Sequence, residues 1–355
     1  MTADFNSPAP IRAGEELPLD RLGAYLRQHL PDANGELTVE QFPHGHSNLT
    51  YLIRLGAKEL VLRRPPFGNV VASAHDMGRE FRMLSRLNAV FPEAPRPELF
   101  CDDGGIIGST FYLMERRQGL ILRKTLPAGI VIDADLARRM SCALIDNLAA
   151  LHAIDYQQAG LSDLGKPEGY VQRQVAGWTK RYAQAQTSVV PAMDRLADWL
   201  GRNQPAESGA AVLHNDFKYD NVMLAADDLT RIVAVLDWEM ATIGDPLLDL
   251  GTSLGYWVEA TDPLPLQQAA FGPTALAGSL TRRELVDRYQ ERTGVEVPDA
   301  RFCYCFGLFK LAVIVQQIYA RFARGTTTDP RFAHLDRLVL ILGEQAERTL
   351  ESNRI

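Results

Sequence analysis

The fold of this chain is decided by two short polar segments that lie beside apolar runs. Residues 214–221 read HNDFKYDN, and Asp237 lies inside residues 233–239, VAVLDWE. A carboxylate at the end of a buried strand costs free energy unless its charge is compensated, and a metal ion is one such compensator. Asp216 and Asn221 are five residues apart, so one loop offers both a proton acceptor and a neutral oxygen ligand of the kind that Mg²⁺ takes. The alternative interpretation is a turn whose Asp and Asn serve as helix caps.

Outward from this site, the sequence predicts two lobes. The first part has short β-rich runs and one main helix, and the second part is mostly helical with a short β interruption at 212–238. The expected strands are 36–42, 49–55, 58–64, 98–101 and 110–115, and the expected helices are 19–30, 73–90, 134–153, 170–186, 190–201, 281–293, 300–324 and 331–351. We expect an α+β fold with a small antiparallel-sheet lobe over residues 1–117 and a larger helical lobe over residues 118–355. Ligand sites favour the cleft between such lobes.

Composition limits the class of protein further. The 355 residues are 46% hydrophobic and 23% charged, and 37 Lys and Arg against 44 Asp and Glu give a net charge of −7. A mildly acidic chain argues against nucleic acid as the main partner. The four cysteines are scattered, and the most apolar stretch of the late chain, Leu311–Val315, is five residues long, whereas a membrane span needs about 20. With no secretory leader in the first residues, we expect a soluble, cytoplasmic protein with no membrane partner.

Three ordered motifs carry a family resemblance. The pattern H-x-D-x-x-x-x-N followed by an isolated Asp resembles the catalytic and metal loops of protein kinases. It is most similar to the aminoglycoside phosphotransferase family of small-molecule kinases, whose loops read HGDFxxxN-like and I/L-D-W-E; here they read HNDFKYDN and LDWE, followed by GDPLLDL at 244–250. Four further segments resemble the branch found fused to, or near, acyl-CoA dehydrogenases: SNLTYLIRL (47–55), VLRRPP (61–66), AHDMGREFRML (74–84) and KLAVIVQQIYARF (310–322). The resemblance covers roughly residues 36–350 and implies a protein-kinase-like two-lobe fold.

The resemblance also implies roles for the second lobe. Asp216 is expected to accept or orient the proton of the substrate hydroxyl, and His214 is grouped with it in the catalytic loop, as a brace rather than as a reacting group. Asn221 and Asp237 are expected to hold Mg²⁺ against the phosphates of ATP. Asp249 resembles the carboxylate that ties the catalytic loop to the following helix.

In the first lobe, we expect a nucleotide clamp. Residues 44–48 (HGHSN) lie between two strands, where backbone N–H groups, Ser47 and Asn48 are expected to close over phosphates. Val61 and Arg63 share one face of a strand, which suits Val61 to cover the adenine and Arg63 to meet the phosphates. Kinases normally have Lys at the Arg63 position, and Arg offers a planar fork instead.

Two further elements complete this clamp. Glu80, in the helix of residues 73–90, is the expected ion-pair partner of Arg63. Met114 and Glu115 lie where the hinge between the lobes is expected, so their backbone is placed to contact the adenine edge. Arg64, on the opposite strand face, is interpreted as a surface charge.

The expected function is an ATP- and Mg²⁺-dependent phosphotransferase that acts on a hydroxyl of a small molecule. The helix over 300–324 carries Lys310, Gln316, Gln317, Tyr319, Arg321 and Arg324, and this charge favours an anionic or acyl-type acceptor such as a hydroxy acid or a hydroxyacyl-CoA. An aminoglycoside-type antibiotic kinase is the first alternative, although a polycation needs a pocket lined by carboxylates. The second alternative, motivated by Arg63 and the glycine-poor loop, is a nucleotide-binding regulatory protein without turnover. The oligomeric state stays open.

Overall fold

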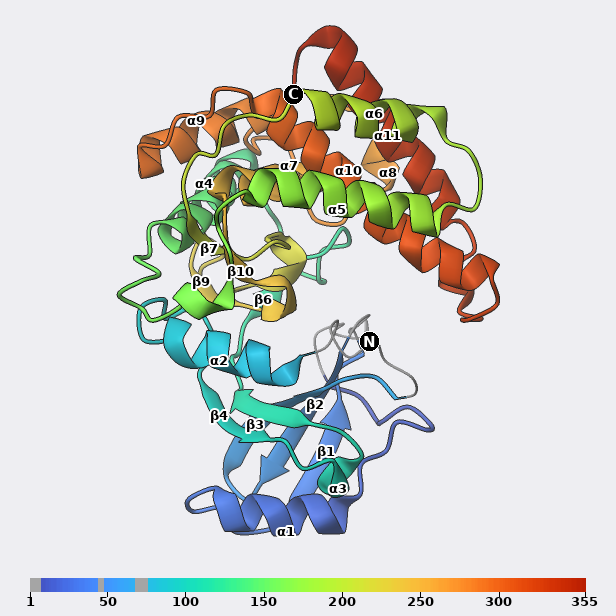
Figure 1. The fold of residues 1–355 in the computed structure, drawn as a ribbon. Coiled ribbons are helices and arrows are strands. Elements are labelled where there is room, and N and C mark those ends of the chain that lie inside the picture. The colour runs from blue at the N-terminus through green and yellow to red at the C-terminus, as the bar shows by residue number, and fades with distance from the viewer. Residues whose placement is uncertain (1–7, 44–47, 68–75) are drawn as a thin grey trace.

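The computed structural model describes residues 8–43, 48–67 and 76–355, which form two lobes (Figure 1). The first lobe contains a five-stranded antiparallel sheet in the order β1-β2-β3-β5-β4. Its elements are α1 (Leu19–His29), β1 (Leu37–Gln41), β2 (Leu49–Leu55), β3 (Lys58–Arg64), α2 (Met77–Leu87), β4 (Pro97–Cys101), α3 (Gly104–Ile107) and β5 (Phe111–Glu115). Helix α1 packs on one face of the sheet, and α2 covers the face that continues into the core of the second lobe.

The second lobe is mostly helical, with two small sheets next to the first lobe. Its helices are α4 (Ala134–His152), α5 (Tyr170–Ala185), α6 (Pro191–Arg202), α7 (Pro246–Tyr256), α8 (Leu264–Gln268), α9 (Arg282–Thr293), α10 (Ala300–Ala323) and α11 (Leu335–Ser352). One sheet has the order β6-β8-β9 and the other pairs β7 with β10; their strands are β6 (Leu120–Ile121), β7 (Ala211–Leu213), β8 (Val222–Leu224), β9 (Ile232–Val235) and β10 (Thr242–Gly244). The predicted α+β two-lobe fold is confirmed.

Element boundaries agree closely with the sequence patterns where apolar residues alternate or recur at helical spacing. Strands β2 and β3 occupy the predicted ranges. Helix α2 begins at Met77, because the carboxylate of Asp76 accepts a hydrogen bond from the backbone N–H of Arg79 and caps the helix; residues 73–75 of the predicted range lie outside the described residues. The last helix begins at Leu335 rather than at 331, because Pro330 begins a short 3₁₀ turn.

Helix α7 is absent from the predicted helices, and it lies at the centre of the second lobe. It starts with Pro246 in its first turn, and the Asp245 carboxylate accepts a hydrogen bond from the backbone N–H of Leu247, a normal start signal for a helix. A Cβ atom at Gly307 of α10 would overlap the carbonyl oxygen of Gly251 of α7. The two helices therefore pack backbone against backbone, as only glycine allows.

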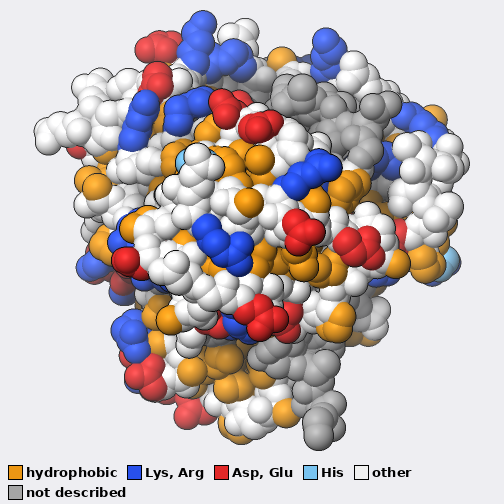
Figure 2. All heavy atoms as spheres, turned by 90° about the horizontal axis from the view of Figure 1, so that it is seen from below, with side chains coloured by type: hydrophobic (Ala, Val, Ile, Leu, Met, Phe, Trp, Pro, Cys, Tyr) orange, Lys and Arg blue, Asp and Glu red, His pale blue; other side chains and the backbone are white. Residues whose placement is uncertain are grey.

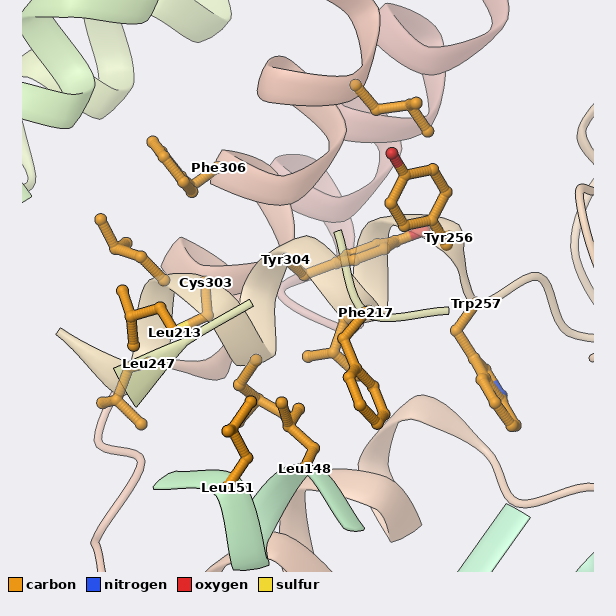
Figure 3. Packing of buried hydrophobic residues seen from close by; sticks show 14 of the residues in the cluster. Leu148, Leu151, Leu213, Phe217, Leu247, Tyr256, Trp257, Cys303, Tyr304 and Phe306 are labelled. Carbon is orange, nitrogen blue, oxygen red and sulfur yellow. The ribbon is translucent and has the colours of Figure 1, made fainter. Parts of the chain in front are cut away.

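The core of the second lobe surrounds this pair of helices. Figure 3 shows Leu148 of α4 and Phe217 of the loop after β7 directed toward each other, whereas Phe306 of α10 points away from them, into another part of the same core. By length and composition, helix α10 is apolar enough to cross a membrane, although the uninterrupted apolar stretch within it, Leu311–Val315, is short. In this structure, 78% of its most apolar window is buried inside the protein. It is thus a core helix in this structure.

The two lobes are joined by α2 as well as by the chain. Arg79 of α2 donates from Nη2 to the carbonyl oxygens of Leu164 (2.8 Å) and Ala241 (2.6 Å).

Seen from below, the molecule carries basic and acidic side chains interspersed among hydrophobic ones (Figure 2). The boundary between the two lobes, placed between residues 117 and 118 from the sequence, stays a prediction.

Candidate active site

The loop after β7 is held by a carboxylate of α7. The carboxylate of Asp249 accepts hydrogen bonds from the backbone N–H of His214 (2.7 Å) and of Asn215 (2.8 Å). Asn215 has a positive φ of 66°, a conformation that an Asn tolerates better than most residues. Burial opposes ionisation of Asp249, but the hydrogen bond from His152 and the nearby positive charges outweigh it and hold the pKa of Asp249 below its ordinary value. A buried, ionised Asp249 thus fixes the backbone next to Asp216.

His214, the first residue of the 214–221 segment, is buried next to the Asp237 loop. Its Nδ1 accepts a hydrogen bond from the backbone N–H of Asp216 (3.2 Å), so its Nε2–H donates to the carbonyl oxygen of Leu236 (2.8 Å). Burial lowers the pKa of His214 and keeps the ring neutral. The geometry makes His214 a link between the Asp216 loop and the Asp237 loop.

Asp216 is surrounded by donors. Lys218 donates from Nζ to Oδ1 (2.7 Å) and Oδ2 (2.6 Å), the hydroxyl of Tyr256 donates to Oδ1 (2.6 Å), and Nδ2 of Asn221 donates to Oδ2 (2.7 Å). Burial opposes ionisation of Asp216, but the Lys218 ammonium and the hydrogen bonds from Lys218 and Tyr256 outweigh it and lower the pKa of Asp216. This carboxylate is therefore ionised at neutral pH.

Asn221 and Asp237 lie at the same end of the β8–β9 ladder. Val222 pairs with Val235, and the backbone N–H of Leu236 donates to the carbonyl oxygen of Asn221 (2.7 Å). Asp237 follows in a left-handed conformation, with φ at 67°. Asn221 thus directly precedes β8 and Asp237 follows the end of the neighbouring strand β9, so their backbones lie side by side.

Asp237 and Asn221 offer oxygen ligands that fit a Mg²⁺ ion whose other ligands are phosphate oxygens. The NH₂ group of Asn221 is engaged with Asp216, which leaves its amide oxygen for a cation. Within the described ranges, no group of three or more His, Cys, Asp or Glu side chains could hold a metal ion. Mg²⁺ is commonly held by one or two protein oxygens and completed by substrate phosphates and water, which matches one carboxylate and one amide.

Arg63 of β3 connects the first lobe to this site. Its Nη1 lies 3.2 Å from Oε1 of Glu80, and its Nη2 lies 2.9 Å from Oδ1 of Asp237 and 3.6 Å from Oε2 of Glu239. Asn48, directly before β2, donates from Nδ2 to the same Glu239 oxygen (2.8 Å). The expected pair of Arg63 and Glu80 is present, and the structure adds a direct contact to the Asp237 loop.

Three further residues assigned to the nucleotide from the sequence lie on the sheet beside Arg63. Val61 pairs with Met114 across β3 and β5, and both belong to the buried cluster that continues into the second lobe. The Glu115 carboxylate accepts hydrogen bonds from the backbone N–H of Arg96 (2.8 Å) and from Nε of Arg117 (2.7 Å), so its side chain is engaged away from Arg63. Ser47 lies outside the described residues.

Two sequence interpretations are corrected here. Lys310 and Gln316 were expected beside the acceptor, but both are buried. Nζ of Lys310 donates to the carbonyl oxygen of Asn215 (2.7 Å), and Nε2 of Gln316 donates to the carbonyl oxygen of Ala185 (2.9 Å). Arg64, interpreted as a surface charge, is buried and donates from Nη1 to the carbonyl oxygen of Ile107 (3.1 Å).

Two contacts of the Asp216 carboxylate were not predicted from the sequence. These are the hydrogen bonds that it accepts from Tyr256 and from Lys218. One signal was available for Tyr256: it lies seven residues after Asp249, which places both residues on one face of a helix. The structure confirms that both reach the same loop.

The fold and this site together define a protein-kinase-like phosphotransferase. Residues 38–285 match the phosphotransferase enzyme family, and the chain belongs to that family. A solved structure of a putative aminoglycoside phosphotransferase from Ralstonia eutropha is similar, with a TM-score of 0.76 and 30% identity, and the match covers 94% of this chain and 99% of that one. A choline kinase from Cryptosporidium parvum has a TM-score of 0.63 at 13% identity, covering 94% and 96% of the two chains, and this likeness concerns the fold.

Curated relatives are longer proteins. The chain is 38% identical to acyl-CoA dehydrogenase family member 11 of Rattus norvegicus over 315 residues, which are 86% of this chain and 40% of that protein. It is 33% identical to acyl-CoA dehydrogenase family member 10 of Mus musculus over 340 residues, which are 95% and 31%. The chain thus spans 40% or less of the length of these two relatives.

Proposed function

We propose that this protein transfers the γ-phosphoryl group of ATP to a hydroxyl of a small molecule. The observation that carries the proposal is the contact of Arg63 with Asp237, because it brings a cation of the sheet lobe to the loop beside Asp216 and Asn221. A phosphoryl transfer needs alignment and charge neutralisation more than covalent chemistry from the protein. These residues supply both.

Each residue has a role in this proposal. Asp216 receives the hydroxyl proton as the acceptor oxygen bonds to the γ-phosphorus and the bond from that phosphorus to the leaving ADP oxygen breaks. Asn221 and Asp237 would hold Mg²⁺, which when bound neutralises charge on the phosphate oxygens. His214 keeps the loop in place.

The sheet lobe binds the nucleotide in this proposal. Arg63 meets the phosphates and is oriented by Glu80; we expect Asn48 and, from the sequence, Ser47 to bind the same phosphates. Val61 and the hinge residues, Met114 and Glu115, contact the adenine.

We further propose an acceptor with an acyl part, a hydroxy acid or a hydroxyacyl-CoA. An apolar cavity of about 20 Å³ is lined by Lys218 and Tyr256 and by Phe217, Leu254 and Phe271; an acyl group would occupy it after these walls move apart. Among its lining residues, Asp220 is the one that carries a carboxylate, whereas a polycationic aminoglycoside needs several. The names of the two curated relatives, acyl-CoA dehydrogenase family members, support the same class of acceptor.

The test is phosphoryl transfer from ATP with Mg²⁺ to a panel that includes 4-hydroxyacyl-CoA and kanamycin. We expect transfer to the acyl acceptor and at least a hundredfold loss in Asp216→Ala, while Asp227→Ala, at an exposed residue between β8 and β9, keeps its activity. Equal transfer by wild type and Asp216→Ala would contradict the catalytic assignment. Preference for kanamycin would overturn the acceptor, and nucleotide binding without transfer to any acceptor would support the regulatory alternative.

A further inference from the structure

The acceptor sites on the Asp216 carboxylate are full in this structure. A carboxylate offers about four lone-pair positions on its two oxygens. Lys218 occupies one position on each oxygen, Tyr256 occupies the second on Oδ1, and Asn221 occupies the second on Oδ2. A substrate hydroxyl that gives its proton to Asp216 must first hydrogen bond to it, so one donor has to leave.

Lys218 is the donor best placed to leave. It bonds both oxygens through a flexible four-carbon side chain that keeps 17% exposure, and its departure frees one position on each oxygen. Asn221 is fixed more firmly, because its Nδ2 also donates to the carbonyl oxygen of Asp216 (2.8 Å). The anionic oxygens of bound substrates are partners of opposite charge for the released ammonium.

Tyr256 is fixed by its surroundings. It is the last residue of α7, two turns after Asp249, which holds the backbone of the same loop. Its ring packs edge-on against Phe271, with centroids 5.4 Å apart, and Nζ of Lys218 lies 4.3 Å from the ring centroid. Helix α7 therefore holds the loop at its backbone through Asp249 and at its carboxylate through Tyr256.

We propose that Tyr256 is a positioning residue for Asp216. When Lys218 leaves, the Tyr256 hydroxyl stays on Oδ1 and the Asn221 amide stays on Oδ2, so the carboxylate keeps its orientation with one position open on each oxygen. The proposal rests on the proposed function for its purpose, but its geometry is independent of turnover. Burial raises the pKa of Tyr256, so the hydroxyl remains a donor throughout the neutral range.

The experiment removes Lys218 to imitate its departure and then removes the Tyr256 hydroxyl. In protein labelled with [4-¹³C]aspartate, the Asp216 resonance is assigned through Asp216→Asn and compared at neutral pH in Lys218→Met, in Lys218→Met/Tyr256→Phe and in Lys218→Met/Tyr182→Phe. Tyr182 is a matched control, because it is a buried tyrosine of α5 whose ring packs against Phe309. Lys218→Gln replaces the methionine variant if that one fails to fold.

We expect the Asp216 ¹³Cγ resonance to move when Tyr256→Phe is added, since a hydrogen bond to the carboxylate is lost. The Tyr182→Phe control should leave the resonance in place. An unmoved resonance in the Tyr256→Phe variant would overturn the proposal. The spectrum needs no acceptor, so a failure to find phosphoryl transfer leaves this result readable. Where transfer is measured, Tyr256→Phe should lower kcat about tenfold with the Kd for ADP unchanged.

Discussion

Nη2 of Arg63 lies 2.9 Å from Oδ1 of Asp237, while Nη1 of the same guanidinium lies 3.2 Å from Oε1 of Glu80. One buried side chain of β3 thus joins a helix of the first lobe to a loop of the second. A lysine has a single ammonium group and cannot reproduce this fork. Kinases normally have Lys at this position. Here the two terminal nitrogens of Arg63 each have a carboxylate partner, Glu80 and Asp237.

We expect Arg63→Met to weaken nucleotide binding at least tenfold, because it leaves Glu80 as a buried charge without its partner and removes the proposed phosphate contact. Arg63→Lys should fall between wild type and Arg63→Met. Calorimetry with ADP measures both. Arg64→Met is the matched control: Arg64 is buried on the opposite face of the strand, so its loss should lower stability and leave the Kd for ADP unchanged. Equal nucleotide affinity in all variants would remove Arg63 from the site.

Magnesium should bind weakly to the protein alone and tightly with a nucleotide. The described residues offer one carboxylate, Asp237, and one amide, Asn221, at the proposed position, with no cluster of three acidic, His or Cys side chains, and Mg²⁺ needs further oxygens. Asp237→Asn should raise the Mg²⁺ concentration for half-maximal transfer at least tenfold, with partial rescue at high Mg²⁺. Asp227→Asn, at an exposed carboxylate between β8 and β9, serves as the control. Tight Mg²⁺ binding by the nucleotide-free protein would contradict this assignment.

His214→Gln should separate bracing from chemistry. The glutamine amide keeps a donor for the Leu236 carbonyl oxygen, so we expect less than a tenfold loss of kcat, against at least a hundredfold for Asp216→Asn. Stability gives a second measurement. Because burial lowers the pKa of His214 in the folded state, the unfolded chain binds more protons just below pH 6.5, and stability falls as the pH falls through that range. His214→Gln should lose this slope.

Lys310 should make stability depend on pH in the alkaline range. Burial lowers the pKa of Lys310 to about 8, against the attraction of Asp249 and Asp216 and with the repulsion of Lys218 and Arg181. Between about pH 8 and the ordinary lysine value of 10.5, the unfolded chain binds more protons, so stability should rise with pH. Relative to Lys310→Met, the wild type should gain on the order of 3 kcal/mol in free energy of unfolding across this range. Denaturant titrations at several pH values measure it, and parallel curves for the two proteins would show that Lys310 does not titrate there.

The contact of α7 with α10 predicts a steric effect. Gly307→Ala places a methyl group against the carbonyl oxygen of Gly251, so we expect a loss of about 1–3 kcal/mol or more in free energy of unfolding. Gly201→Ala, in α6, is the control, because nothing lies within 4 Å of a Cβ there; it should stabilise by up to about 1 kcal/mol. Urea denaturation compares the two. A Gly307→Ala variant as stable as wild type would mean that the helices can separate without cost.

Local patterns were sufficient for much of the fold. Strands β2 and β3 alternate between two buried faces, so period 2 correctly placed Val61 with Arg63 and Leu62 with Arg64 on opposite sides. The main helices were visible from apolar residues at helical spacing. Helix α7 was missed because nearly all of its residues are buried, which leaves no polar face to show a period.

In the candidate site too, local patterns indicated some residues and did not indicate others. The spacing within residues 214–221 and the position of Asp237 indicated the site, because one loop and one strand end define them locally. The destination of long side chains could not be predicted: Lys310 and Gln316 lie on a helix whose sequence does not tell which face meets solvent. Both turned inward, because buried carbonyl oxygens there need donors.

By itself, the sequence determined the two-lobe plan, the polar loops and the residues that share each strand face, because these depend on neighbours within a few positions along the chain. Tertiary structure alone decided that Arg63 reaches Asp237, that Lys310 braces Asn215 and that Tyr256 donates to Asp216. The physical reason is that such contacts join elements far apart in the chain. Close packing of those elements, down to the glycine contact of α7 with α10, determines which side chains meet.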